Sequence, residues 1–352
     1  MSAIRELLRP HVADVPAYVT ARSEHADGIL LDANENAFGS PISNDEAALH
    51  RYPDPANQEL RNALAGRLQI EPSRLWLGNG SDSAIDLLVR TLTEPGAPVA
   101  VPSPSYGVYS QRVRAHAGTV REFRLDADFD LDPVTAREAS RSASLCILCS
   151  PNNPTGNLLS RDRVLDHLET IDGVLAVDEA YVEFAGEGFS LAREAGGTGP
   201  FERLVVIRTL SKAWGLAGAR VGYLVGSPAL IDALDRVGLP YPLSALAARA
   251  ALEALEHESL VEERIARIST ERDRLTGELA GLGIRSLPSD ANFLCFFVSD
   301  AAKLQSRLAR IHGVVVRDRS GMPGLEGALR VTVGTPAEND AFLSALRKEL
   351  SA

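Results

Sequence analysis

The sequence predicts an α/β protein whose main sheet is mostly parallel. Between about residues 75 and 225, short apolar runs such as APVAV, SLCILC, GVLAV and RLVVI alternate with amphipathic segments such as SDSAIDLLVRTL and RDRVLDHLETI. This alternation is typical of a parallel sheet covered by helices. After Gly238 a long helix-forming stretch precedes NFLCFFV, VVVRD, LRVTVGT and a closing helix. We therefore expect an arm over residues 1–31, a large domain over 32–238 and a smaller α+β domain over 239–352.

Composition and charge exclude several classes of partner. The 352 residues carry a net charge of −11, and no block of Lys or Arg suggests a nucleic-acid surface. The opening MSAIRELLRPHVADV lacks the apolar segment of a signal peptide, and no stretch reaches the roughly 18 apolar residues of a membrane span. We expect a cytoplasmic protein that binds neither nucleic acid nor membrane. Cys146 and Cys149 lie in an apolar run and predict a buried strand rather than a redox or metal pair.

Two segments place a reactive side chain at the end of a predicted strand, where open α/β sheets bind ligands. In RLVVIRTLSKAWGLAGARVGY, Lys212 follows the strand among small residues, a setting that can desolvate an amine for Schiff-base chemistry; the alternative is an ordinary surface lysine. In VLAVDEAYVEF, Asp178 ends an apolar run. A buried carboxylate needs a cationic or hydrogen-bonding partner. A protonated pyridine nitrogen would provide one, and so would a structural salt bridge or a magnesium ion.

Two further turns offer polar groups at the same edge. In LCSPNNPTGN, Asn153 projects an amide from a turn stiffened by prolines, although such a turn also forms without a function. In WLGNGSDSAIDLLVR, a glycine turn precedes a helix that starts at Ser81, and exposed amides at a helix start bind phosphate. Since the carboxylate of Asp82 would repel a phosphate, we expect it to turn away while its backbone amide binds.

One aromatic residue and two arginines complete the candidates. Tyr106 can stack on a flat ring or simply pack in the core. Arg317 in VVVRDR and Arg330 in LRVTVGT lie in apolar strands, where a substrate carboxylate or a buried acid would compensate their charge.

The combination of SPNNPTG, DEAY and TLSKAWGLAGARVGY, in this order, resembles the aspartate-aminotransferase superfamily of fold-type I pyridoxal-phosphate enzymes. Within it, LDANENAFGS, HRYPDP, SPSYGVYS, LPYPLS and VVVRDR followed by LRVTVGT are similar to the histidinol-phosphate aminotransferase family. The resemblance runs from about Val15 to the last helix. It implies a large domain with a mostly parallel sheet and a smaller C-terminal domain.

The resemblance also implies roles for individual residues. Lys212 would be the Schiff-base lysine and Asp178 the partner of the pyridine nitrogen, while Asn153 and Tyr181 would bind the ring oxygen. Tyr106 would stack on the cofactor ring. Tyr52 would reach the cofactor of a neighbouring subunit, which implies a homodimer with shared active sites. The implied cofactor-phosphate positions are Ser81, Asp82, Ser83, Thr209, Ser211 and Arg220, and the implied substrate positions are Tyr18, Asn34, Arg317 and Arg330. Ser83 departs from the acidic residue common in the family.

The implied reaction is transamination between histidinol phosphate and 2-oxoglutarate, which yields imidazole-acetol phosphate and glutamate in histidine biosynthesis. An aromatic amino-acid aminotransferase and a threonine-phosphate decarboxylase share the cofactor site and are the alternatives. A non-catalytic regulator with the same fold is a third, because a fold alone does not establish activity.

Overall fold

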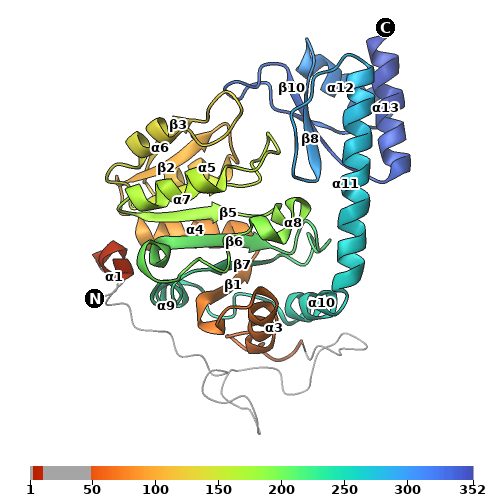
Figure 1. The fold of residues 1–352 in the computed structure, drawn as a ribbon. Coiled ribbons are helices and arrows are strands. Elements are labelled where there is room, and N and C mark those ends of the chain that lie inside the picture. Colours follow the sequence, from red (N-terminus) through yellow and green to blue (C-terminus); the bar gives the residue numbers. More distant parts are fainter. Residues whose placement is uncertain (1–2, 11–48, 352) are drawn as a thin grey trace.

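The computed structural model describes residues 3–10 and 49–351, and its centre is a seven-stranded sheet in the order β1-β7-β6-β5-β4-β2-β3 (Figure 1). β7 is antiparallel to both neighbours, and the other pairs are parallel. The mostly parallel sheet confirms the predicted α/β class. In chain order the strands are β1 (Leu75–Asn79), β2 (Pro98–Ser103), β3 (Thr119–Arg124), β4 (Leu145–Cys149), β5 (Val174–Asp178), β6 (Leu204–Thr209) and β7 (Val221–Val225).

Helices cover both faces of this sheet. Every residue of β4, β5, β6 and β7 is buried, which explains why these strands read as continuous apolar runs. In Figure 1, α7 and α8 lie in front of the sheet and α4 lies behind it, with a separate apolar cluster on each face. Around this sheet lie α1 (Ala3–Leu7), α3 (Gln58–Leu68), α4 (Ser81–Leu92), α5 (Val108–Ala115), α6 (Pro133–Ser140), α7 (Arg161–Thr170), α8 (Val182–Ala185) and α9 (Pro228–Val237).

The C-terminal part forms a second layer around the three-stranded antiparallel sheet β8-β10-β9. The long helix α11 runs from the lower end of the large sheet to this smaller one (Figure 1). The strands of this C-terminal part are β8 (Phe293–Phe297), β9 (Arg317–Asp318) and β10 (Ala328–Thr332), and its helices are α10 (Ala245–Glu256), α11 (Glu258–Gly281), α12 (Ala301–His312) and α13 (Pro336–Leu350). Since α10 packs against α3 and β7 of the large sheet, the domain boundary after residue 238 stays a prediction.

Several helices begin where a side chain accepts a backbone hydrogen bond. Asp132, Ser227, Ser244 and Asp300 cap α6, α9, α10 and α12 in this way, and Thr335 forms a capping box with the first turn of α13. Each such cap stabilises a helix by about 1 kcal/mol. These polar positions therefore have a local structural role.

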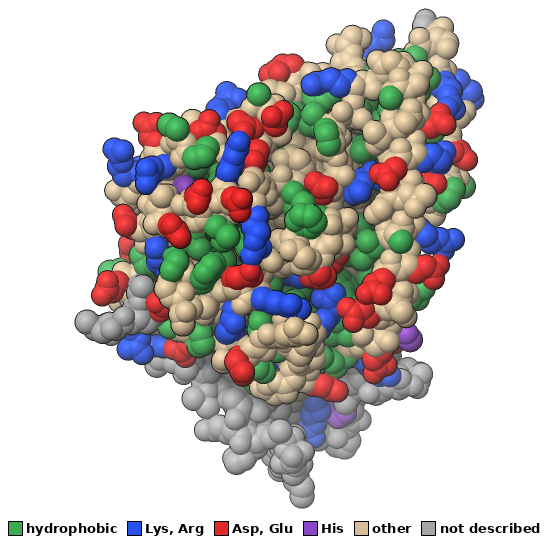
Figure 2. All heavy atoms as spheres, viewed as in Figure 1, with side chains coloured by type: hydrophobic (Ala, Val, Ile, Leu, Met, Phe, Trp, Pro, Cys, Tyr) green, Lys and Arg blue, Asp and Glu red, His purple; other side chains and the backbone are tan. Residues whose placement is uncertain are grey.

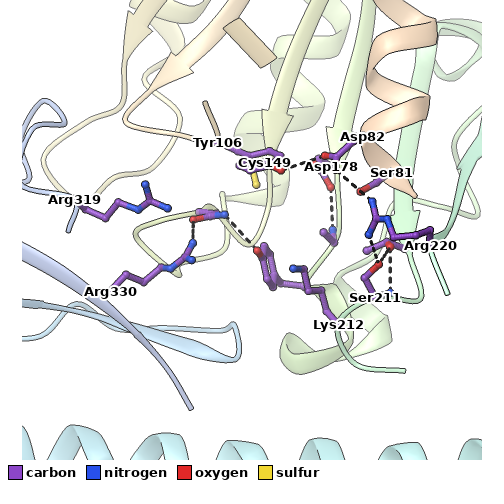
Figure 3. A pocket seen from close by; sticks show the side chains of 14 residues that line it. Ser81, Asp82, Tyr106, Cys149, Asp178, Ser211, Lys212, Arg220, Arg319 and Arg330 are labelled. Atoms are coloured by element: carbon purple, nitrogen blue, oxygen red, sulfur yellow. Dashed lines mark hydrogen bonds and ion pairs between the residues drawn. The ribbon is translucent and has the colours of Figure 1, made fainter. Parts of the chain in front are cut away.

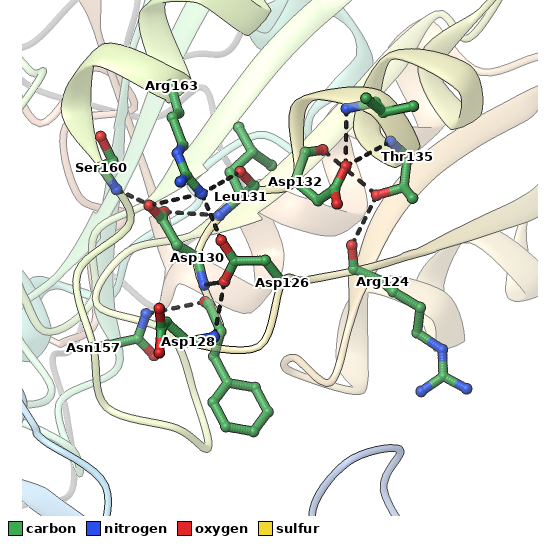
Figure 4. Close-up of polar contacts among 12 residues, drawn as sticks. Arg124, Asp126, Asp128, Asp130, Leu131, Asp132, Thr135, Asn157, Ser160 and Arg163 are labelled. Carbon is green, nitrogen blue, oxygen red and sulfur yellow. Dashed lines mark hydrogen bonds and ion pairs between the residues drawn. The ribbon is translucent and has the colours of Figure 1, made fainter.

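An acidic loop over residues 126–132 joins β3 to α6 (Figure 4). Asp126 accepts the backbone N–H groups of Asp128 and Asp130, and Arg163 forms ion pairs with Asp126 (2.6 Å) and Asp130 (3.2 Å). The Phe129 ring packs beside apolar residues of the small domain. The loop therefore uses its acidic residues internally and contributes an apolar contact between the two parts of the molecule.

On the face shown in Figure 2, acidic and basic side chains are interspersed with apolar ones. Within residues 3–10 and 49–351, no helix combines the length and apolar character that crossing a bilayer requires.

Candidate active site

A pocket of about 270 Å³ lies where the carboxyl ends of β4, β5 and β6 meet the start of α4 and the small domain (Figure 3). The loops that follow these strands converge there because parallel strands end at a common edge. Most of the predicted site residues come together in this pocket. It is lined by Ser81, Asp82, Tyr106, Cys149, Asn153, Asp178, Ala180, Tyr181, Thr209, Ser211, Lys212, Arg220, Arg319 and Arg330.

Asp178 is the last residue of β5 and is only 3% exposed. Its carboxylate accepts hydrogen bonds from the Tyr109 hydroxyl (2.8 Å) and the Ala180 backbone N–H (3.1 Å). Burial raises the pKa of Asp178 to about 6, and the Tyr109 hydrogen bond opposes that rise. A cation beside this carboxylate would offset the cost of its burial.

Lys212 lies three residues beyond the end of β6, with Nζ 5.7 Å from the centre of the Tyr181 ring. Desolvation, followed by the charge of Arg330, lowers the pKa of Lys212 below its usual value, although the side chain stays accessible to solvent. A lower pKa makes the neutral, nucleophilic amine more available. The chain has three lysines, and the other two, Lys303 and Lys348, lie on α12 and α13.

A chain of hydrogen bonds joins the large and small domains across the pocket. The Asn153 amide nitrogen donates to the Tyr181 hydroxyl (3.3 Å), and the Arg330 guanidinium donates to the Asn153 amide oxygen (2.5 Å). Figure 3 shows the Arg330 side chain extending into the pocket from the small domain. Residues on three separate elements thus fix each other's orientation.

The start of α4 and the loop after β6 form a polar cradle at the opposite end. The Thr209 hydroxyl donates to the Ser211 hydroxyl (2.9 Å), and an Arg220 nitrogen lies 3.5 Å from the same oxygen. A Cβ on Gly222 would lie 2.2 Å from the Gly80 carbonyl carbon and 2.3 Å from the Ser81 nitrogen. Only glycine therefore lets β7 pass so close to this helix start, whose free amides can bind an anion.

Asp82 does not turn its carboxylate away as expected. One oxygen lies 3.5 Å from an Arg220 nitrogen, and the other accepts the Tyr106 hydroxyl at 3.1 Å. Arg220 and Tyr106 attract the carboxylate to the pocket. The expectation from the sequence considered only its repulsion from a phosphate and not these two partners. Burial and Asp82 together raise the pKa of Tyr106 to about 12, so the phenol remains protonated at neutral pH.

Comparison with known proteins assigns the family. The model of aminotransferase class I and II matches residues 26–346. The chain belongs to this family. Histidinol-phosphate aminotransferases from Parabacteroides distasonis and Xanthomonas euvesicatoria are 39% and 38% identical to it, and each alignment covers 99% of the chain and at least 98% of the relative. The predicted membership in the histidinol-phosphate aminotransferase family, and hence among the transaminases, is confirmed.

Solved structures agree with this assignment. Histidinol-phosphate aminotransferase from Sinorhizobium meliloti, in complex with pyridoxal-5'-phosphate, superposes with a TM-score of 0.78 at 27% identity and covers 97% of the chain and 96% of that structure. L-threonine-O-3-phosphate decarboxylase from Porphyromonas gingivalis superposes with a TM-score of 0.74 at 27% identity, covering 86% of the chain and 92% of that structure. The aminotransferase fold is therefore confirmed. Because an aminotransferase and a decarboxylase both superpose on the chain, the fold alone does not distinguish transamination from decarboxylation.

Three predicted residues within the described part lie outside the pocket lining. The Ser83 hydroxyl donates to the Gly80 carbonyl (2.8 Å) within its own helix turn. Tyr52 is 51% exposed and stacks on Tyr241 at 4.5 Å. Arg317 is exposed on β9, opposite Arg330 on β10. Tyr18 and Asn34 lie outside the described residues.

Sequence reasoning missed two polar residues at this site. Tyr109 follows Tyr106 by one helical turn in SPSYGVYS, and this spacing was the available signal for a second inward-facing tyrosine. Arg319 follows Arg317 by two residues in VVVRDR. Cys149 also lines the pocket, and its burial in β4, together with that of Cys146, confirms the predicted buried strand.

Proposed function

We propose that the protein uses pyridoxal 5'-phosphate to transaminate histidinol phosphate with 2-oxoglutarate, which gives imidazole-acetol phosphate and glutamate in histidine biosynthesis. The observation that carries the proposal is the joint presence, in one pocket, of the Lys212 amine, the buried Asp178 carboxylate and the polar cradle around Arg220. The near-full-length likeness to histidinol-phosphate aminotransferases supports the substrate. The cytoplasmic location remains a prediction.

The residues present fit the cofactor. Asp178, a buried acid whose pKa is raised, suits a protonated ring nitrogen. The backbone amides at the start of α4, where Gly222 adds no side chain to crowd them, suit a phosphate. When bound, the cofactor supplies an electron-withdrawing ring that makes the substrate Cα–H acidic. Ser81, Asp82 through its amide, Thr209, Ser211 and Arg220 would hold its phosphate.

The chain's own groups then have distinct tasks. Lys212 would carry the cofactor and, once released, accept the Cα proton on Nζ and deliver it to the C4′ atom of the cofactor, a role that its lowered pKa favours. Asp178 would keep the ring nitrogen protonated. Asn153 and Tyr181, already hydrogen-bonded to each other, would donate to the ring oxygen, while Tyr106 would stack on the ring. Arg330 would hold the anionic group of the substrate in its planar fork.

Reductive trapping tests the covalent role of Lys212. Borohydride reduction of the holoenzyme followed by peptide mass spectrometry should place the cofactor mass on Lys212 and on neither of the other two lysines. Lys212→Ala should fold, lose the trapped label and lose transamination, whereas Lys303→Ala, on the exposed side of α12, should keep both. Normal turnover by Lys212→Ala would refute the mechanism.

Three amino donors separate the proposed substrate from its rivals. Purified enzyme receives histidinol phosphate, phenylalanine or threonine phosphate, each with 2-oxoglutarate, and glutamate formation is followed. Histidinol phosphate should give the highest kcat/KM. A preference for phenylalanine would make the protein an aromatic aminotransferase, and release of carbon dioxide from threonine phosphate would make it a decarboxylase.

The exposed position of Tyr52 supports a homodimer in which this residue completes the partner's site. Leu239 and Leu246 are also exposed, at 76% and 56%, and Leu239 and Tyr241 line the same surface groove. Tyr52→Ala and Lys212→Ala, each impaired alone, should form mixed dimers in which one of the two sites is intact. An equimolar mixture should therefore recover about a quarter of wild-type activity. No recovery despite subunit exchange would exclude shared sites.

A further inference from the structure

The side chain of Asn152, next to the pocket residue Asn153, is buried and has both of its polar atoms engaged. It is only 1% exposed, and its amide nitrogen donates to the Pro104 carbonyl (3.0 Å) and to the Thr155 hydroxyl (2.8 Å). Its amide oxygen accepts the Ser105 hydroxyl (2.8 Å). Asn152 therefore joins two loops that follow different strands of the large sheet, β4 and β2.

Each of these loops contains a residue of the proposed cofactor site. Ser105 immediately precedes Tyr106 in the loop after β2. Asn152 immediately precedes Asn153 in the turn after β4. Tyr106 and Asn153 both line the pocket, and Figure 3 shows Tyr106 at its wall. Since Tyr106 would stack on the cofactor ring and Asn153 would donate to the ring oxygen, the Asn152 side chain connects the loops that would contact the face and the edge of one flat ring.

The backbone pairing of the sheet does not extend to these two loops. The parallel pairing of β2 with β4 ends at Ala100 and Cys146, although each strand runs three residues further. Within the described part of the chain, the hydrogen bonds that join residues 101–106 to residues 147–153 both involve the Asn152 side chain. The separation of the loops beyond the paired region therefore depends on one buried amide.

The turn that contains Asn153 is also anchored from the small domain, because the Arg330 guanidinium donates to the Asn153 amide oxygen (2.5 Å). The Tyr106 ring is less firmly held. It is only partly buried, and its hydroxyl donates to the Asp82 carboxylate (3.1 Å), which is itself 46% exposed. Asn152 therefore fixes the loop of Tyr106 relative to a turn that is already anchored.

We propose that Asn152 is a positioning residue, which holds Tyr106 where its ring can stack on the cofactor while Asn153 meets the ring oxygen. This inference rests on the proposed function, in which pyridoxal phosphate occupies the pocket. Asparagine suits the task because its short side chain presents two N–H donors and one acceptor in a single plane. Aspartate lacks both donors, and the single hydroxyl of serine cannot donate to two partners.

The cofactor affinity of Asn152→Ser tests the positioning role. Cofactor-free protein is titrated with pyridoxal phosphate, and the visible circular dichroism of the bound cofactor, which depends on the orientation of its ring, is recorded. The Kd should rise about twofold to tenfold, the range for loss of one aromatic stacking contact, and the dichroism should decrease.

Asn339→Ser is the matched control. Asn339 is 2% exposed, and its amide nitrogen likewise donates twice, to Glu271 (2.8 Å) and to the Gly334 carbonyl (3.0 Å), in the small domain. Loss of this buried amide should lower stability to urea about as much as Asn152→Ser does, while the Kd for pyridoxal phosphate and the dichroism stay unchanged.

A double-mutant cycle distinguishes positioning from a general weakening of the turn. If Asn152 acts through Tyr106, Asn152→Ser should change the Kd less than about twofold in a Tyr106→Ala background. Ser105→Ala removes one of the two bonds between the loops and should give a smaller change of the same kind. Because this milder variant leaves both amide donors in place, it provides the test if Asn152→Ser does not fold.

The outcomes separate this inference from the proposed function. An unchanged Kd and dichroism in Asn152→Ser, or in Ser105→Ala should the first variant not fold, would overturn the positioning role, and so would an equal loss with and without the Tyr106 ring. If the variants show the expected pattern but the wild type does not transaminate histidinol phosphate, the proposed substrate fails and the positioning role stands. A wild type that binds no pyridoxal phosphate would refute both.

Discussion

Replacement of Asp178 by asparagine should separate two effects of the buried carboxylate. One is its cost in folding free energy when the cofactor is absent, and the other is its contribution to catalysis when the cofactor is bound. Burial raises the pKa of this group from 3.8 to about 6 in the protein without cofactor. Each pKa unit corresponds to about 1.4 kcal/mol, so the ionised carboxylate destabilises the cofactor-free fold by about 3 kcal/mol at most. Asparagine occupies the same volume, keeps an acceptor for the Ala180 N–H and can donate to the Tyr109 oxygen.

The stability difference between the wild type and Asp178→Asn should depend on pH, because the folded carboxyl has a raised pKa. Between pH 3.8 and about 6 the folded carboxyl retains a proton that the unfolded one has lost, so stability of the wild type falls as pH rises through this range. The advantage of Asp178→Asn should be absent near pH 4, grow toward pH 6 and stay constant above it. We expect about 1–3 kcal/mol at pH 7.5, since solvent relaxation reduces the full value.

Urea denaturation of cofactor-free protein at several pH values measures this difference at a fixed protein concentration. Asp172→Asn, an exposed carboxylate just before β5, is the control and should have little effect. With cofactor bound, the order of stability should reverse, because breaking a buried ion pair costs about 3–5 kcal/mol. Asp178→Asn should also lose about a hundredfold to a thousandfold in kcat, because a ring nitrogen without its proton withdraws electrons less strongly. A variant less stable than the wild type at every pH, or equally active, would refute the reasoning.

Three further substitutions test other parts of the site. Tyr109→Phe removes a donor to Asp178, so the pKa of that carboxyl should rise further and the acidic limb of the kcat/KM profile should move to higher pH; an unmoved limb would contradict this. Arg330→Lys keeps the charge but loses the fork, and should raise the KM of both amino donors about tenfold in the same assay. Gly222→Ala places a Cβ against the start of α4 and should lower stability to urea by more than about 2 kcal/mol, whereas Gly277→Ala in α11, with open space around it, should stabilise by up to about 1 kcal/mol.

The sequence by itself determined the architecture and the positions of the main candidate groups along it. Continuous apolar runs identified strands covered on both faces, and the structure buries these runs completely. Asp178, Asn153 and Lys212 each follow such a run. Since parallel strands end at one edge, their positions along the chain already imply that they meet, and the structure brings them into one pocket.

Only the tertiary structure decided which side chains face the pocket. Tyr109 reaches Asp178 because α5 packs beside β2 and turns that tyrosine toward the sheet, and Asp82 turns inward because Arg220, 138 residues away in sequence, attracts it. Arg319 lines the pocket, whereas Arg317 lies exposed on β9, although only two positions separate them in sequence. Orientation depends on partners from distant elements, and a linear pattern contains no information about which of those partners will be adjacent.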